Sequence, residues 1–242
     1  MKVTILSRWI LWTIFTAWVV NASGEIRFSA VLRGPNDVPP NVSDARGKAV
    51  FFLNGNELQY AASVEFFYAW HGWIHGPAAP VTTGSVIFSV APYGCVTPNP
   101  TGTNPGGCGW YGFLTLTDAQ AEQLRAQQWY FRVSDGTSAV RGQILLDEDL
   151  DGTDDSRDQC PGTPWCGDLC YELFRGGYVD SRGCTVEQLP QLCPCEGPWK
   201  GHGEYVKCIK GAVAGFVQEG FMTAEDGRAI EKQAVKSDCG KR

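Results

Sequence analysis

The sequence predicts a mainly β fold followed by a small helical unit, and three observations lead to this prediction. Short apolar segments recur between Glu25 and Leu146 with Gly- and Pro-rich turns between them, which is typical of a β-sandwich or barrel. A strongly acidic stretch then begins at Asp147. From Trp165 the chain becomes rich in cysteine, and its apolar residues then change to helical spacing.

Local signals place the elements of the β region. The segment AVFFLNGNELQYAASVEF has two apolar runs around NGNE (54–57), which predicts a hairpin. GSVIFSV (84–90) and YGFLTLT (111–117) predict further strands, and residues 129–146 predict a second hairpin around DGTS. Thr117 is expected to cap a helix over DAQAEQLRAQQ. We expect a disulfide between Cys95 and Cys108 to join the ends of the long loop 94–109.

The first 22 residues predict a secretory signal peptide. Lys2 and Arg8 supply a basic start, WILWTIFTAWVV (9–20) is an uncharged apolar run, and small residues follow at 22–24. An uncleaved membrane anchor is the alternative, but the run is short for a bilayer span, and no later segment is long and apolar enough. The protein is therefore expected to be secreted, periplasmic or on the cell surface.

Cysteine count and charge fit export and exclude some partners. All 10 cysteines follow the apolar start, and an even count in an exported chain predicts disulfides. Without Lys2 and Arg8, the 20 basic residues become 18 against 26 acidic ones, a net charge of −8. Such a surface argues against nucleic acid and anionic lipid headgroups as partners.

Several motifs follow one another along the β region. They are FSAVLRGPNDVPP (28–40), Gly47 before a strand, HGWIHGPA (71–78), LTDAQAEQL (116–124) and VRGQI (140–144). In this order and spacing they resemble the CHRD domain, a module common in secreted bacterial proteins. The resemblance implies an immunoglobulin-like or superoxide-dismutase-like β-sandwich, and a role in binding rather than catalysis.

The acidic stretch predicts a calcium site. Counted from Asp147 as position 1, oxygen-bearing residues fall at positions 1, 3, 5, 7, 9 and 12 of a twelve-residue loop, with Gly152 at position 6, where an EF-hand-style loop turns sharply. A plain acidic linker is the alternative, and Asp154 does not fit the ligand pattern and is expected to be solvated. The predicted ligands are Asp147, Asp149, Asp151, Thr153, Asp155 and Asp158.

Two motifs follow the loop, CPGTP (160–164) and YVDSRGC (178–184). CPGTP resembles the signature of thrombospondin type 3 repeats, which also occur in exported bacterial proteins, and YVDSRGC is similar to the way these repeats rejoin their fold. The resemblance implies a disulfide between Cys160 and Cys184.

The C-terminal residues predict a disulfide-stapled helical hairpin. Apolar residues from Tyr205 to Val217 have helical spacing, and TAED (223–226) predicts the capped start of a second helix ending near Ser237. Cys239 could pair with Cys193, Cys195 or Cys208. The chain is thus divided into a signal peptide (1–22), a CHRD-like β-sandwich (25–146), a calcium loop with a Cys-rich connector (147–184) and the hairpin (185–242).

A catalytic role has weaker support. His71 and His75 share one face of a predicted strand, so a copper- or zinc-dependent redox enzyme is an alternative. Two histidines without a convergent third ligand make a poor metal site, so His75 is expected to hydrogen-bond within a turn. The Cys-Pro-Cys at 193–195 lacks the spacing of thiol–disulfide enzymes, and the tryptophans are expected to pack in the core.

The sequence therefore predicts an exported, calcium-binding, non-enzymatic protein with a role in adhesion or in a matrix. Its partner would be an extracellular or envelope ligand, either a protein or a glycan. A purely structural component of the cell envelope is a further alternative.

Overall fold

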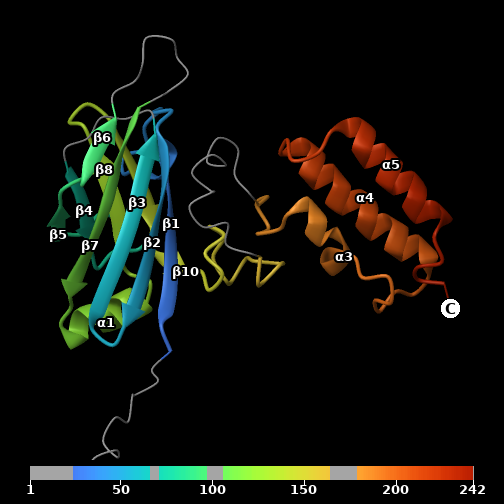
Figure 1. Cartoon of the computed structure of the whole chain (residues 1–242), viewed down its shortest axis with the longest axis horizontal. Coiled ribbons are helices and arrows are strands. Elements are labelled where there is room, and N and C mark those ends of the chain that lie inside the picture. Colours follow the sequence, from blue (N-terminus) through green and yellow to red (C-terminus); the bar gives the residue numbers. More distant parts are fainter. Residues whose placement is uncertain (1–23, 66–70, 97–105, 164–178, 242) are drawn as a thin grey trace, which may run out of the picture.

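The computed structural model describes residues 24–65, 71–96, 106–163 and 179–241. In Figure 1 a β-structure is followed by the acidic stretch and then by a group of helices. The predicted signal peptide lies outside the described residues, as do Trp70, Trp165, Cys166 and Cys170.

In the described part of the chain, ten strands form one antiparallel sheet. Their order is β5-β4-β8-β9-β1-β2-β3-β7-β6, and β10 pairs with β1. The strands are β1 (Ile26–Arg33), β2 (Arg46–Asn54), β3 (Glu57–Glu65), β4 (His71–His75), β5 (Val86–Val90), β6 (Gly94–Val96), β7 (Gly107–Thr115), β8 (Tyr130–Ser134), β9 (Ala139–Gln143) and β10 (Leu145–Leu146).

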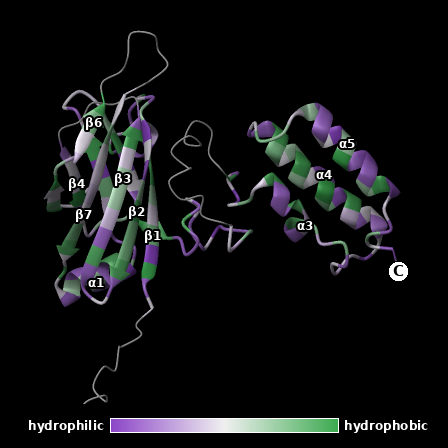
Figure 2. Ribbon diagram, in the orientation of Figure 1, coloured by the Kyte–Doolittle hydropathy of each residue, from purple (hydrophilic) through white to green (hydrophobic). Residues whose placement is uncertain are grey.

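The sheet curls around a single hydrophobic core. The ring of Phe131 in β8 lies 6.3 Å from Phe51 of β2 and 6.1 Å from Trp110 of β7. Because β8 is not a neighbour of β2 or β7 in the sheet, these contacts bring two parts of the sheet face to face. Alternate residues along β2 are buried, although the strand is hydrophobic on both faces over residues 49–53, and Figure 2 shows how hydropathy is distributed over the sheet. The mainly β prediction is confirmed, while the class of sandwich stays a prediction.

The local signals in the β region are confirmed. Asn54 pairs with Glu57 across the β2–β3 turn, and Ser134 pairs with Ala139 across the β8–β9 turn. Thr117 caps helix α1 (Asp118–Arg125), where its side chain accepts a hydrogen bond from the Gln120 N–H. Trp110 and Trp129 are fully buried in the core, as expected.

The helices after residue 184 form a second hydrophobic cluster. Thr223 caps the last helix by accepting a hydrogen bond from the Asp226 N–H, which confirms the predicted start. The longest helix buries Tyr205, Ile209, Ala212, Val213 and Phe216. The elements outside the sheet are η1 (Gly34–Asn36), which precedes β2, and η3 (Val186–Gln188), α3 (Leu189–Leu192), α4 (His202–Gln218) and α5 (Ala224–Lys236).

Four disulfides lie in the described residues. Cys95–Cys108 and Cys160–Cys184 are the two predicted pairs. Cys239 pairs with Cys195, and Cys193 pairs with Cys208. Both cysteines of the Cys-Pro-Cys motif therefore staple the helical unit, in agreement with a structural role.

Cys160 and Cys184 belong to the hydrophobic cluster of the helices rather than to that of the sheet. The Cys160–Cys184 disulfide is thus packed with the helical unit. The exact domain boundaries drawn from the sequence stay a prediction.

Candidate metal centre

The acidic stretch leaves the sheet at the end of β10 and folds back on itself. The Asp147 N–H donates to the Arg27 carbonyl (3.2 Å), and the Asp155 N–H donates to the Leu146 carbonyl (3.0 Å). Between them Gly152 has a φ of +105°, a conformation that L side chains rarely adopt. This is the sharp turn that the sequence predicts at Gly152.

The turn brings three carboxylates together. Asp147, Asp149 and Asp151 each offer one oxygen, and these oxygens lie within 4.8 Å of one another. Backbone N–H groups orient the first of them, because Asp151 donates to Asp147 Oδ1 (3.1 Å) and Gly152 donates to Asp147 Oδ2 (2.8 Å). We call Asp147, Asp149 and Asp151 the acidic cluster.

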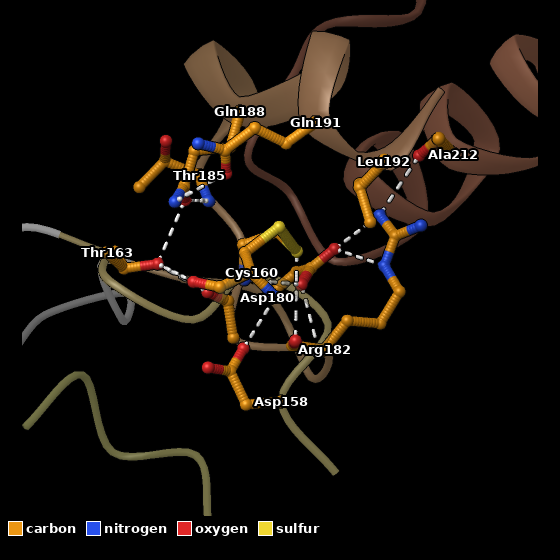
Figure 3. Close-up of a disulfide and its surroundings, with 12 residues drawn as sticks. Asp158, Cys160, Thr163, Asp180, Arg182, Thr185, Gln188, Gln191, Leu192 and Ala212 are labelled. Carbon is orange, nitrogen blue, oxygen red and sulfur yellow. Dashed lines mark hydrogen bonds and ion pairs between the residues drawn. A yellow bond between two sulfur atoms is a disulfide. The ribbon is translucent and has the colours of Figure 1, made fainter. Parts of the chain in front are cut away.

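Asp158 and the acidic cluster both lie next to Gly183, the residue before Cys184 of the Cys160–Cys184 disulfide. A Cβ atom at position 183 would lie 2.3 Å from Asp158 Oδ1 and 2.9 Å from Asp151 Oδ2. The two oxygens therefore both occupy the space next to Gly183 that a side chain at this position would need. Asp158 Oδ1 also accepts a hydrogen bond from the Cys160 N–H (2.7 Å), as Figure 3 shows.

Asp155 and Thr153, two further predicted ligands, have contacts of their own within the stretch. The exposed Asp155 turns back to accept a hydrogen bond from the Glu148 N–H (2.8 Å). Thr153 is buried, and its N–H donates to Asp151 Oδ1 (2.6 Å). The main chain of Thr153 thus helps to position Asp151.

The second Asp151 oxygen has no hydrogen bond. Asp151 Oδ2 is buried and lacks a partner among the described residues. Burial, with repulsion from Asp149, Asp147 and Asp158, raises the pKa of Asp151 from 3.8 to about 7, against the Thr153 N–H, which lowers it. Burial likewise raises the pKa of Asp147 to about 6. The cluster thus carries negative charge that is only partly neutralised.

Two cations reach the acidic stretch from the sheet: Arg27 of β1 donates to the Glu148 carbonyl (3.4 Å), and Lys48 of β2 reaches further along the stretch. Its ammonium group donates to the Leu150 carbonyl, 102 residues along the chain, and a Cβ atom at Gly152 would lie 3.3 Å from Nζ. Its charge lowers the pKa of Asp147. Sequence reasoning did not single out Lys48, because no local signal links a strand residue to a loop so far along the chain.

The far side of the stretch is held by hydrogen bonds around Thr163. The N–H groups of Gly162 and Thr163 donate to Asp149 Oδ2 (2.9 and 2.7 Å). The Thr163 hydroxyl, visible in Figure 3, lies 2.8 Å from the carbonyls of both Cys160 and Gly183. Thr163 thus links Asp149 to Gly183 through hydrogen bonds.

The predicted exposure of Asp154 is wrong. Asp154 is only 8% exposed, and its carboxylate accepts hydrogen bonds from Ser156 and Arg157. These bonds hold the pKa of Asp154 below its ordinary value against the burial that raises it. The residue is paired within the turn rather than solvated, because Arg157 three residues later folds over it.

The donor set of the acidic cluster suits a hard cation. All its candidate ligand atoms are carboxylate oxygens, which Ca²⁺ prefers, and the buried Asp151 Oδ2 has an unused lone pair. The residues present therefore fit calcium, with Asp147, Asp149 and Asp151 as the ligands that the geometry favours most.

The histidines do not form a comparable site. The His75 imidazole stacks on Tyr130, with 4.6 Å between ring centroids, and its Nδ1 lies 3.0 Å from the Gly84 carbonyl, which requires an Nδ1–H donor. Burial, the first cause, and the charges of Arg132 and Arg141 lower the pKa of His75. Among the described residues, no group of three metal-binding side chains includes His71 or His75. The expected hydrogen bond of His75 is confirmed.

Three of the motifs that resemble CHRD converge on the outer face of the sheet. Asp37 comes from the first, His75 from the second and Arg141 from the last, and Arg132 of β8 binds Asp37 between them. Residues 28–144 match the CHRD domain. The resemblance predicted for these residues is confirmed, and three of its motifs are spatial neighbours.

The comparisons give no further relative, since neither the curated proteins nor the solved structures contain a match. The CHRD domain and the disulfides indicate an extracellular or secreted protein. Within the described ranges, none of the helices has the length and apolar character of a membrane span.

Proposed function

We propose that this protein is an exported calcium-binding protein without catalytic activity, in which the CHRD domain binds an extracellular or envelope partner. One observation carries the calcium assignment. Three carboxylates converge within 4.8 Å, and the buried Asp151 Oδ2 beside them has no partner among the described residues. Like charges so arranged are unfavourable until a cation neutralises them.

Calcium bound here would supply positive charge to the acidic cluster, and the residues of the stretch would hold the ion and orient its ligands. Asp147, Asp149 and Asp151 hold the ion, and Asp158 stands opposite, at Gly183. The backbone N–H groups that bond Asp147 and Asp149 keep these carboxylates in place before the ion arrives.

The role of the site is structural. Its residues lie between β10 of the CHRD domain and the disulfide that begins the helical unit. A neutralised cluster would lock Gly183 and Asp158 against the end of the sheet. In this proposal the acidic stretch is a thrombospondin type 3-like repeat, supported by the CPGTP that follows it and by the Cys160–Cys184 pair.

A binding role for the CHRD domain agrees with the outer face of the sheet. Three polar side chains of this face are held by ion pairing or stacking: Arg132 pairs with Asp37, and His75 and Arg141 lie against the Tyr130 ring. His75, the strongest catalytic candidate, donates a hydrogen bond to the Gly84 carbonyl and stacks on the Tyr130 ring. Adhesion or matrix assembly is the function class that this arrangement supports.

The test is a calorimetric calcium titration of the oxidised, calcium-depleted protein. We expect one site with a dissociation constant of roughly 10⁻⁶ to 10⁻³ M, and a rise in the melting temperature on binding. Asp151→Asn and Asp158→Asn should abolish or strongly weaken binding. Asp154→Asn is the matched control, since Asp154 is paired with Arg157 in the same stretch. A wild-type protein that shows neither heat nor stabilisation would make the stretch a plain linker.

A further inference from the structure

A second site lies on the outer face of the sheet, around Arg141 of β9. Arg141 and Gln143 line a cavity of about 400 Å³. Its other walls come from the residues after η1, from Pro80 and Val81, and from the acidic stretch at Asp154 and Arg157. The cavity is therefore built from parts of the chain that are far apart in the sequence.

Arg141 is a buried guanidinium with few partners. It is 1% exposed, and its guanidinium carbon lies 3.5 Å from the centroid of the Tyr130 ring. Its single hydrogen bond within the described residues is a long one, from Nη2 to the Ala79 carbonyl (3.4 Å). Since a guanidinium has five N–H donors, most of the donors of Arg141 are unused. Burying such a charge is costly unless an anion pairs with it.

The carboxylates that line the cavity near Arg141 are paired with other arginines. Asp37 binds Arg132 through two parallel hydrogen bonds, Nε to Oδ1 (2.9 Å) and Nη2 to Oδ2 (3.0 Å). Asp154 is paired with Arg157. The charge of Asp37 also acts on Arg141, but Asp37 forms no hydrogen bond with it, so neither carboxylate of the cavity lining is bonded to Arg141.

Gln143 is the second residue of the cavity lining with a polar atom that lacks a hydrogen bond within the described residues. Its side-chain amide donates to the carbonyls of Ala78 (3.1 Å) and Gln127 (2.8 Å), which fixes the NH₂ group on that side. The opposite atom, Oε1, is buried and has no partner among the described residues. It is an acceptor that lacks a donor. The remainder of the lining is mainly apolar, with Val31, Val38, Pro40, Pro80, Val81 and Leu145.

We propose that this cavity binds the C-terminal residue of a peptide with a small apolar side chain. The carboxylate would pair with Arg141, whose planar group suits two-point binding of a carboxylate. The N–H of the same residue would donate to Gln143 Oε1, and the side chain would fill the apolar part. A carboxylate, an N–H and a compact apolar group occur together in that residue.

The test is a titration of the full, calcium-saturated protein with N-acetyl-Ala-Val, followed by NMR. We expect a saturable shift with a dissociation constant on the order of 1 mM or tighter. The C-terminal amide of the same peptide should bind at least tenfold more weakly, because it cannot pair with Arg141. Isobutyrate, which lacks the N–H, should also bind more weakly than the peptide.

Variants separate binding from folding. Val81→Asp places a negative charge on an 81% exposed rim residue and should weaken the peptide at least tenfold without disturbing the core. Arg141→Lys keeps the charge but loses the planar fork, and should weaken it as well. Arg228→Met, at an exposed position of α5, is the control and should have no effect.

Three results would overturn the proposal. They are equal binding of acid and amide, tighter binding of sulfate than of the peptide, and an unchanged affinity in Val81→Asp. Isobutyrate as strong as the peptide would refute the peptide assignment and leave a small carboxylic acid as the ligand. Calcium titration of the same samples reports separately on the acidic cluster, so the failure of one site is distinguishable from the failure of the other.

Discussion

Gly183 lies directly against Asp158, since a Cβ atom at position 183 would come within 2.3 Å of the Asp158 Oδ1 atom. The two residues belong to segments that the Cys160–Cys184 disulfide joins. Asp151 Oδ2 lies against the same point. Glycine is required here for space, and its φ of +77° adds a second reason.

Gly183→Ala should therefore damage both the fold and the metal site. We expect a loss of about 1 kcal/mol from the backbone conformation and about 1–3 kcal/mol more from the clash with the carboxylates. Calcium affinity should fall too, because Asp158 and Asp151 must move apart. Chemical denaturation and a calcium titration measure the two effects.

Gly220→Ala is the matched control for this prediction. Gly220 has a φ of +85°, and nothing lies within 4 Å of a Cβ atom there. It should show the conformational loss alone, with unchanged calcium binding. Equal losses of stability in the two variants would mean that the contact of Gly183 with Asp158 has no energetic weight.

The pH dependence of stability should differ between the metal-free and the calcium-bound protein. The raised pKa values of Asp147 (about 6) and Asp151 (about 7) mean that the metal-free folded protein binds more protons than the unfolded chain, in which each value is near 3.8. The stability from these two groups is complete below the unfolded value and is lost as the pH rises through 6 and 7. In chelator, the melting temperature should fall between about pH 5.5 and pH 8.

Saturating calcium should remove or reverse this trend, because the ion replaces protons on the carboxylates and binds better as they ionise. Asp151→Asn should flatten the trend in chelator, since the amide does not titrate. Thermal unfolding followed by circular dichroism gives both series. A metal-free melting temperature that climbs across this window would contradict the assigned pKa directions.

The Cys160–Cys184 disulfide should matter for calcium as well as for stability. Replacing both cysteines with alanine opens a loop between residues 24 apart in sequence, at a cost of about 3 kcal/mol. Asp158 and Gly183 would no longer be held together, so calcium affinity should drop. The matched control replaces Cys193 and Cys208, which are 15 residues apart within the helical unit.

The control pair should cost similar stability but leave calcium affinity unchanged. Denaturant unfolding and calorimetry on both variants make the comparison. Calcium affinity that falls equally in both would show that the site depends on general stability rather than on this link.

The sequence predicted what local signals encode. The NGNE hairpin, the Thr117 and Thr223 caps and the turn at Gly152 each depend on a few adjacent residues. The acidic cluster was found because its three carboxylates alternate within five residues. Asp155 pointed away from the cluster and Asp154 was buried, because the bonds that decide their orientation depend on how the turn folds around them.

Contacts between distant segments could not be predicted in this way. Lys48 reaches Leu150 across 102 residues, and Arg132 reaches Asp37 across 95. Neither pairing leaves a local pattern, since each depends on the register of strands in the curled sheet. The unmet charge of Arg141 likewise becomes visible only when its surroundings are known.

Lys48 should act as an internal competitor of calcium. Its ammonium group lies at Leu150 and beside Gly152, and the charges of Asp147, Asp151 and Asp149 act on it, although burial lowers its pKa. A cation in this position neutralises part of the charge that calcium would otherwise meet. Lys48→Met keeps the apolar length of the side chain and removes that charge.

The substitution should have opposite effects in the two states. The metal-free protein should become less stable, because the carboxylates lose a partner and the Leu150 carbonyl loses a donor. Calcium should bind several-fold more tightly, corresponding to about 1 kcal/mol of lost repulsion. Lys210→Met, on the exposed side of α4, is the control of equal charge and should change neither quantity. Weaker calcium binding in Lys48→Met would instead mean that Lys48 organises the acidic stretch for the ion.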